Sequence, residues 1–281
     1  MIFTITLLMF AATSVISIKS LFSEDEKDIP NTKMLFCIST LVFIILGISK
    51  IDFSGNGCLN EILFSIWGYF YLLSLILIII ISYLVFSRWH QHWKPIIALA
   101  APFITVLLMI SILFINSGRR FAFNPAQSLV TRHMLPVHIL INLTGELFFF
   151  LSFIGSILYL LMERHLRKKS SIKFIHRMPS LEAIESFNQW AISRSLTFLS
   201  AGIIIGMIME LINYSTVSLG TAKEIHLYFS WMVIFIIYLI RRSMKMPSHK
   251  TSIINIAVFT FVMFLFIFTN IFITSGFHSF K

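Results

Sequence analysis

Charged residues are scarce in this chain, and their scarcity excludes a soluble globular protein. Only 12% of its 281 residues are Asp, Glu, Lys or Arg, whereas a soluble domain carries roughly 25%. Hydrophobic residues make up 57% of the chain, and the mean hydropathy is +0.89. We therefore predict an all-α, multi-pass membrane protein whose helices form one bundle, a single transmembrane domain over residues 1–281.

Cysteine is the second scarce residue type. The chain has two, Cys37 in an apolar run and Cys58 in a Gly-Asn-Gly-Cys stretch, and no Cys-x-x-Cys pair. Two such residues do not make a disulfide framework, and Cys37 fits the behaviour of a small hydrophobic residue. The sequence therefore gives no reason to assign thiol–disulfide chemistry. No catalytic constellation stands out either, which favours a protein that is not itself an enzyme.

Long polar segments, low-complexity linkers and internal repeats are also missing, and apolar runs of helical length take their place. A helix that crosses a bilayer needs about 20 mainly apolar residues. We predict about eight transmembrane helices. The candidate spans are Ile2–Ile18, Met34–Ser49, Ile62–Phe86, Pro95–Asn116, Leu135–Met162, Ala191–Ile212, Ile225–Ile240 and Ile253–Ser275. The first run lacks a basic n-region and an Ala-x-Ala site, which favours a retained span over a signal peptide.

The positive charge is distributed unevenly between the two sets of loops. Most of the 22 Lys and Arg residues follow the first, third, fifth and seventh spans, with the densest group in the loop 163–189. Cytoplasmic loops retain Lys and Arg, so we predict that these loops face the cytoplasm and that both termini face outward. Membrane topology thus accounts for the net charge of +10, and we expect no nucleic-acid partner.

One polar stripe interrupts the fifth apolar run. His138, Asn142 and Glu146 recur four residues apart, which places them on one side of a helix. Polar groups in a membrane span are costly and turn toward the bundle interior. Two roles are open for the stripe. It supports a ligand or carries a proton, or it forms a plain hydrogen-bond network between helices.

Four of the nine histidines lie at or near the predicted outer side, and for two of them, His133 and His226, a structural role is favoured. The other two belong to different spans. His138 begins the fifth span, and His278 follows the eighth. Neutral imidazoles from two helices can ligate a haem iron axially, although two interfacial histidines without a common partner fit the same pattern. We interpret His165, His176 and His249 as solvated loop residues.

Several segments together resemble a known family. They are Leu-Pro-Val-His138, Arg177-Met-Pro-Ser-Leu-Glu182, the glycines from Gly202 to Gly206, Lys223-Glu224 and Gly-Phe-His278-Ser-Phe. In this order the chain resembles the HemX/CcsA-type cytochrome c assembly proteins, which are haem-handling proteins of the bacterial inner membrane. The resemblance implies that the chain binds or passes haem at the outer face of that membrane.

The resemblance also implies a set of site residues. By motif match, His138 and His278 are the axial ligands of the haem iron. Tyr214 is the aromatic residue that remains in the segment where the family has a tryptophan-rich loop. The implied cofactor is haem b, bound non-covalently. Arg119, Arg120 and Arg132 are candidates to pair with its propionates. Cytochrome c maturation proteins are the implied partners, besides the lipid bilayer.

The chain departs from the family pattern at two places. Of the tryptophan-rich loop, only Gly206, Lys223 and Glu224 are kept, so stacking of a porphyrin on indoles is largely lost. Ile240 stands where CcsA-type members carry a histidine. Two alternatives follow. One is a HemX-like regulator that acts on glutamyl-tRNA reductase through the loop 163–189, and the other is an unrelated small-molecule transporter.

Overall fold

The computed structural model describes residues 2–22, 32–50, 66–86, 93–114, 129–168, 178–214, 222–243 and 246–272. Within these ranges the chain forms eight α-helices and no strand, so the all-α prediction is confirmed there. Each predicted span coincides with one of the helices. The chain divides into two compact units, which are described one at a time.

The first unit contains residues 1–120 and 169–179. Its helices are α1 (Ile2–Phe22), α2 (Thr32–Lys50), α4 (Ile66–Phe86) and α5 (Trp93–Phe114). α5 packs against both α1 and α4, and α1 packs against α2. The buried ring of Phe10 meets the rings of Phe36 and Phe43 edge-on at 6.3 Å, a favourable aromatic geometry. Phenylalanine packing therefore holds α1 to α2.

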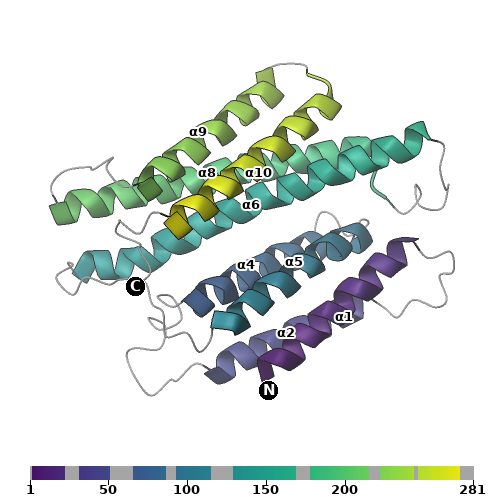
Figure 1. Ribbon diagram of the computed structural model, residues 1–281, viewed down its shortest axis with the longest axis horizontal. Coiled ribbons are helices and arrows are strands. Elements are labelled where there is room, and N and C mark those ends of the chain that lie inside the picture. The colour runs from purple at the N-terminus through teal and green to yellow at the C-terminus, as the bar shows by residue number, and fades with distance from the viewer. Residues whose placement is uncertain are drawn as a thin grey trace. The chain divides into compact units, whose positions relative to one another are not determined.

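The second unit contains residues 121–168 and 180–281. Its helices are α6 (Leu129–Arg167), α8 (Leu181–Tyr214), α9 (Ala222–Ser243) and α10 (Ser248–Phe272). The long helices α6 and α8 lie alongside each other and make the most extensive contact of the chain, as Figure 1 shows. α9 packs on α8, and α10 packs on both α6 and α9. This unit contains the His138 region and both cavities described below.

α8 begins ten residues before the span predicted from Ala191, because the Pro-Ser turn before it is a helix cap. Ser180 Oγ accepts a hydrogen bond from Ala183 N at 3.2 Å, and the Ser180 carbonyl accepts one from Ile184 N at 3.0 Å. Such a serine satisfies the amides that a helix start leaves unpaired. Hydropathy alone misses this first part of α8 because it is polar.

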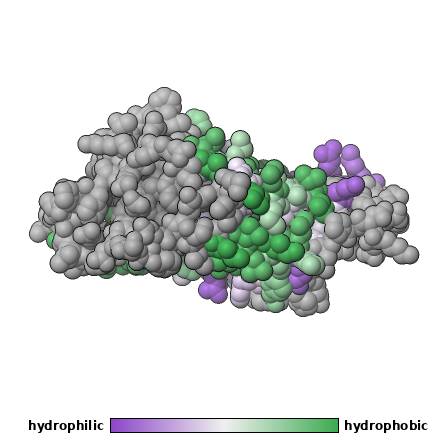
Figure 2. Space-filling model, turned by 90° about the horizontal axis from the view of Figure 1, so that it is seen from below, coloured by the Kyte–Doolittle hydropathy of each residue, from purple (hydrophilic) through white to green (hydrophobic). Residues whose placement is uncertain are grey.

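Four helices of the described chain are long and apolar enough to cross a membrane. They are Pro95–Leu113, Met134–Arg167, Leu181–Ile212 and Ser248–Leu265, and shorter apolar helices cover Thr4–Ser20, Thr32–Ile45 and Phe70–Phe86. On the face drawn in Figure 2, hydrophobic residues cover much of the described surface, as expected for contact with lipid. The number of spans and the outward direction of the termini stay predictions.

Candidate functional site

The imidazole of His138 is turned from α6 toward α8 and is buried, with 8% of the residue exposed. Its Nδ1 lies 2.9 Å from the carbonyl oxygen of Gly202. A carbonyl can only accept a hydrogen bond, so Nδ1 carries the proton and donates it. In a neutral imidazole the lone pair is then on Nε2, the nitrogen that a metal ion would use.

Glycines on α8 make this close approach possible. A Cβ atom at Gly206 would lie 2.9 Å from His138 Cε1, and one at Gly202 would lie 1.9 Å from Asn142 Oδ1. Both distances are shorter than van der Waals contact, so a larger residue would push the two side chains away from α8. The side chains of His138 and Asn142 therefore pack directly against Gly206 and Gly202 of α8.

Asn142 lies one helical turn from His138 and contacts its ring. The Asn142 Nδ2 atom is 3.1 Å from His138 Nε2 and 3.4 Å from Nδ1. The Asn142 Oδ1 atom is buried and has no hydrogen-bond partner among the described residues. An unpaired buried acceptor is costly, which marks this amide as a group that could be paired in another state of the site.

Glu146 completes the stripe one turn further along α6. It lines a cavity of about 30 Å³ together with Ser230 of α9 and apolar residues of α8 and α10. The lining is mainly apolar, and Glu146 and Ser230 are its two polar residues; a cavity of this size has room for about one water molecule. The three stripe residues thus face neighbouring helices, as predicted, but the cavity beside Glu146 is far too small for a porphyrin.

The other predicted site residues are not brought together by the described part of the chain. Arg132 lies near the start of α6 and Tyr214 is the last residue of α8, and only their helix positions are described. His278, Arg119 and Arg120 lie outside the described residues. The pairing of His138 with His278 and the contacts of the three arginines therefore stay predictions.

A polar network that the sequence analysis did not identify joins three helices of the second unit. Asn255 Nδ2 of α10 donates to Ser152 Oγ and Ser156 Oγ of α6, at 2.8 Å each, and Asn188 of α8 donates to Ser156 Oγ at 3.4 Å. Single Asn and Ser residues in apolar runs are the only sequence signal for it. Hydrogen bonds between helices hold a bundle together in a membrane, so we assign this network to structure.

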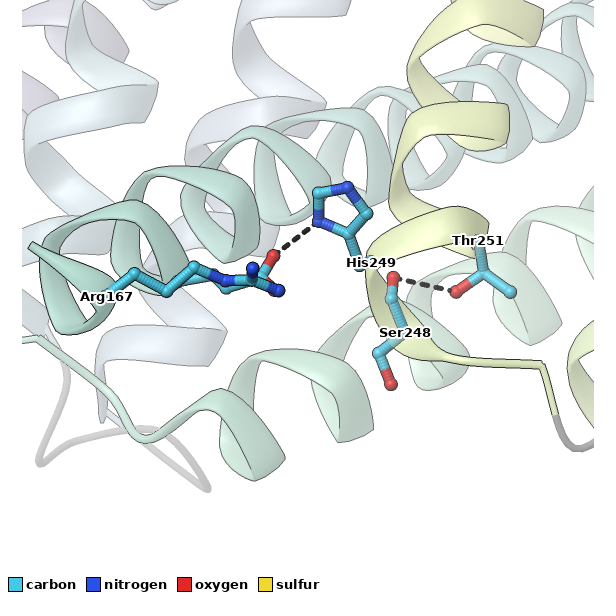
Figure 3. Close-up of polar contacts among 5 residues, drawn as sticks. Arg167, Ser248, His249 and Thr251 are labelled. Carbon is cyan, nitrogen blue, oxygen red and sulfur yellow. Dashed lines mark hydrogen bonds and ion pairs between the residues drawn. The ribbon is translucent and has the colours of Figure 1, made fainter.

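Two of the histidines interpreted as solvated loop residues lie in helices, His165 in α6 and His249 in α10, and both remain at least partly exposed. His249 makes a contact that the loop interpretation did not include. It lies in the first turn of α10, and its Nδ1 is 2.5 Å from a carboxylate oxygen of Glu163, which also pairs with Arg167 at 2.7 Å. Figure 3 shows His249 and Arg167 approaching one another at this end of α6. Ser248 beside it donates to Glu185 of α8. These polar contacts tie the start of α10 to α6 and α8.

Comparison with known proteins agrees with the resemblance drawn from the motifs. The family model described as cytochrome C assembly protein matches residues 63–278. The match includes α4, α5, all four helices of the second unit and the position of His278. No curated protein and no solved structure matches the chain.

Proposed function

This chain belongs to the cytochrome c assembly protein family, and from that premise we propose that it binds or passes haem at the predicted outer end of α6 and α8. Membership supports a role in cytochrome c biogenesis. The chain has no Cys-x-x-Cys motif with which to process the thiols of an apocytochrome. Covalent attachment of haem would then be the task of partner maturation proteins.

One observation carries this proposal, namely the way in which His138 is held. Histidines that ligate metals typically donate their second ring nitrogen to a carbonyl or carboxylate, which fixes both the tautomer and the ring orientation. The bond from His138 Nδ1 to the Gly202 carbonyl, on a glycine surface that allows it, has this form. A buried, oriented imidazole fits an axial haem ligand.

Haem binding at His138 would require a local rearrangement. The amide of Asn142 lies within hydrogen-bond distance of Nε2, the nitrogen that would bind iron. That amide would have to rotate away, and its unpaired Oδ1 gives it reason to take another partner. We propose that the Asn142 amide rotates away from His138 Nε2 when haem binds.

The remaining site residues complete the proposal by motif and charge. His278 would be the second axial ligand of a non-covalently held haem b. Arg119, Arg120 and Arg132 would pair with the propionates, and Tyr214 would offer the one aromatic ring of the shortened loop. Haem would supply a redox-active iron, and these side chains would hold and orient it.

The visible spectrum of the purified protein tests the proposal. We expect a Soret band, either from copurified haem or after addition of haemin, that is lost in His138→Ala and in His278→Ala. His249→Ala is the matched control, because it removes a histidine of the same chain that pairs with Glu163. Added imidazole should restore part of the band in His138→Gly, since the free base can fill the space left by the ring.

Absence of the band in the wild-type protein, with and without added haemin, would contradict haem binding. Retention of the full band in both histidine variants would contradict the assignment of the ligands. In the first case the HemX-like regulator becomes the leading function. Binding of glutamyl-tRNA reductase to the wild-type protein, and its loss when the charges of loop 163–189 are neutralised, would then be the deciding measurement.

A further inference from the structure

A second cavity lies between α8 and α9, at the end of these helices that carries the Arg241–Arg242 pair. Its volume is about 270 Å³. Its polar lining consists of Ser186, Gln189 and Ser193 from α8 and Tyr238, Arg241 and Arg242 from α9. It is separate from the His138 region, which lies toward the other end of α8. In the sequence, both arginines belong to the basic group that follows the seventh predicted span.

Arg241 is the unusual residue of this cavity. Its Nε and Nη2 atoms are buried and have no hydrogen-bond partner among the described residues. A buried cationic donor without a partner is strongly unfavourable. Nε and Nη2 lie along one edge of the planar guanidinium, where the two N–H groups form a fork that matches two oxygens of one anion. The free edge of Arg241 is thus shaped for a bidentate oxyanion.

Positive charge exceeds negative charge around the cavity, which favours the binding of an anion. Burial lowers the pKa of the Arg241 guanidinium, and the nearby Glu185 carboxylate acts in the opposite direction. That carboxylate accepts a hydrogen bond from Ser248, and the Arg242 side chain reaches the Tyr238 hydroxyl at 3.5 Å. The cavity lining contains two arginines and no carboxylate, and Glu185 acts on Arg241, so a bound anion would compensate the remaining positive charge.

We propose that this cavity binds the phosphate group of an anionic phospholipid headgroup. Basic pockets between membrane helices on the cytoplasmic side are suited to such headgroups, and the charge distribution predicts that this end is cytoplasmic. Trp190 also lines the cavity, and Trp and Tyr are typical of the membrane–water interface. The volume admits a headgroup, while the acyl chains would lie along the apolar helix surfaces outside.

Lipid retention by the delipidated full-length protein tests this proposal. Phosphatidylglycerol or phosphatidylcholine is added to the protein in detergent, and the number of bound lipid molecules is measured by native mass spectrometry. We expect the wild-type protein to retain phosphatidylglycerol at least about tenfold better than phosphatidylcholine, because the zwitterionic headgroup of phosphatidylcholine carries a positive charge of its own. Millimolar inorganic phosphate should reduce this retention by competing for the same fork.

Variants of Arg241 separate charge from geometry. We expect Arg241→Gln to remove the preference for phosphatidylglycerol and Arg241→Lys to lose most of it, since lysine keeps the charge without the fork. Arg164→Gln is the matched control, because it removes an exposed arginine of α6 that lies outside the cavity. Elution as a single species in size-exclusion chromatography shows which variants remain folded.

Three results would overturn the proposal. Equal retention of both lipids by the wild-type protein would contradict it without reference to any variant. Equal losses in Arg241→Gln and Arg164→Gln would reduce the effect to overall charge. Stabilisation by inorganic phosphate without lipid retention would refute the lipid source and assign the cavity to free phosphate. The Soret measurement at His138 is independent of these outcomes.

Discussion

Replacement of Gly202 by alanine should weaken the packing of α6 against α8 and change haem binding at the same time. The new Cβ would lie 1.9 Å from Asn142 Oδ1, so the amide must swing away from α8. Overpacking of this kind costs about 1–3 kcal/mol, and alanine recovers about 1 kcal/mol because it favours a helix more than glycine does. We expect the free energy of unfolding to fall by about 0–2 kcal/mol.

A second substitution isolates the cause. In an Asn142→Ala background the obstructing amide is absent, so Gly202→Ala should be neutral or stabilising. The coupling energy of the double-mutant cycle should then be about 1–3 kcal/mol. Equilibrium unfolding in mixed detergent micelles, followed by tryptophan fluorescence, measures all four proteins under the same conditions.

The same helices provide a matched control far from the histidine. A Cβ at Gly155 would lie 2.0 Å from Asn188 Oδ1, so the Gly155/Asn188 cycle should show a similar coupling energy. Only the Gly202/Asn142 cycle should alter the Soret band, because Asn142 contacts the His138 ring whereas Asn188 pairs with Ser156. A coupling energy below about 0.5 kcal/mol in both cycles, or equal spectral changes in both, would refute this reasoning.

Three further outcomes are expected. Ser200→Ala removes the 2.7 Å hydrogen bond from Trp231 Nε1; it should lower the free energy of unfolding by about 0.6–1.7 kcal/mol and shift the tryptophan emission, and an unchanged emission spectrum would argue against the bond. Glu163→Gln weakens the ion pairs of Glu163 with Arg167 and His249 and should lower the free energy of unfolding by less than about 1 kcal/mol. This loss should become smaller in high salt, and a loss that salt leaves unchanged would argue against an electrostatic origin. Gly206→Ala should weaken haemin binding, measured by titration at the Soret band, since the new Cβ would lie 2.9 Å from the His138 ring; undiminished affinity would contradict a fixed ring position.

The order of amino acids was sufficient to predict the helical class and the approximate position of each described helix. A run of about 20 apolar residues can satisfy its backbone in lipid only as a helix or in a closed barrel, so hydropathy reveals the runs directly. The four-residue spacing of His138, Asn142 and Glu146 likewise places them on one helix side without knowledge of any neighbour. The family also followed from short motifs, and the family match agrees with it.

Only the tertiary structure decided which surfaces meet. Gly202 accepts the hydrogen bond from His138, 64 residues earlier in the chain, and Asn255 reaches two serines about 100 residues away. The sequence presents Arg241 as one more loop charge, yet its Nε and Nη2 atoms are buried beside a cavity without a hydrogen-bond partner among the described residues. Hydropathy reports how each residue partitions between water and lipid. It carries no information on which small residue leaves room for which side chain across a helix interface, because that depends on two distant segments at once.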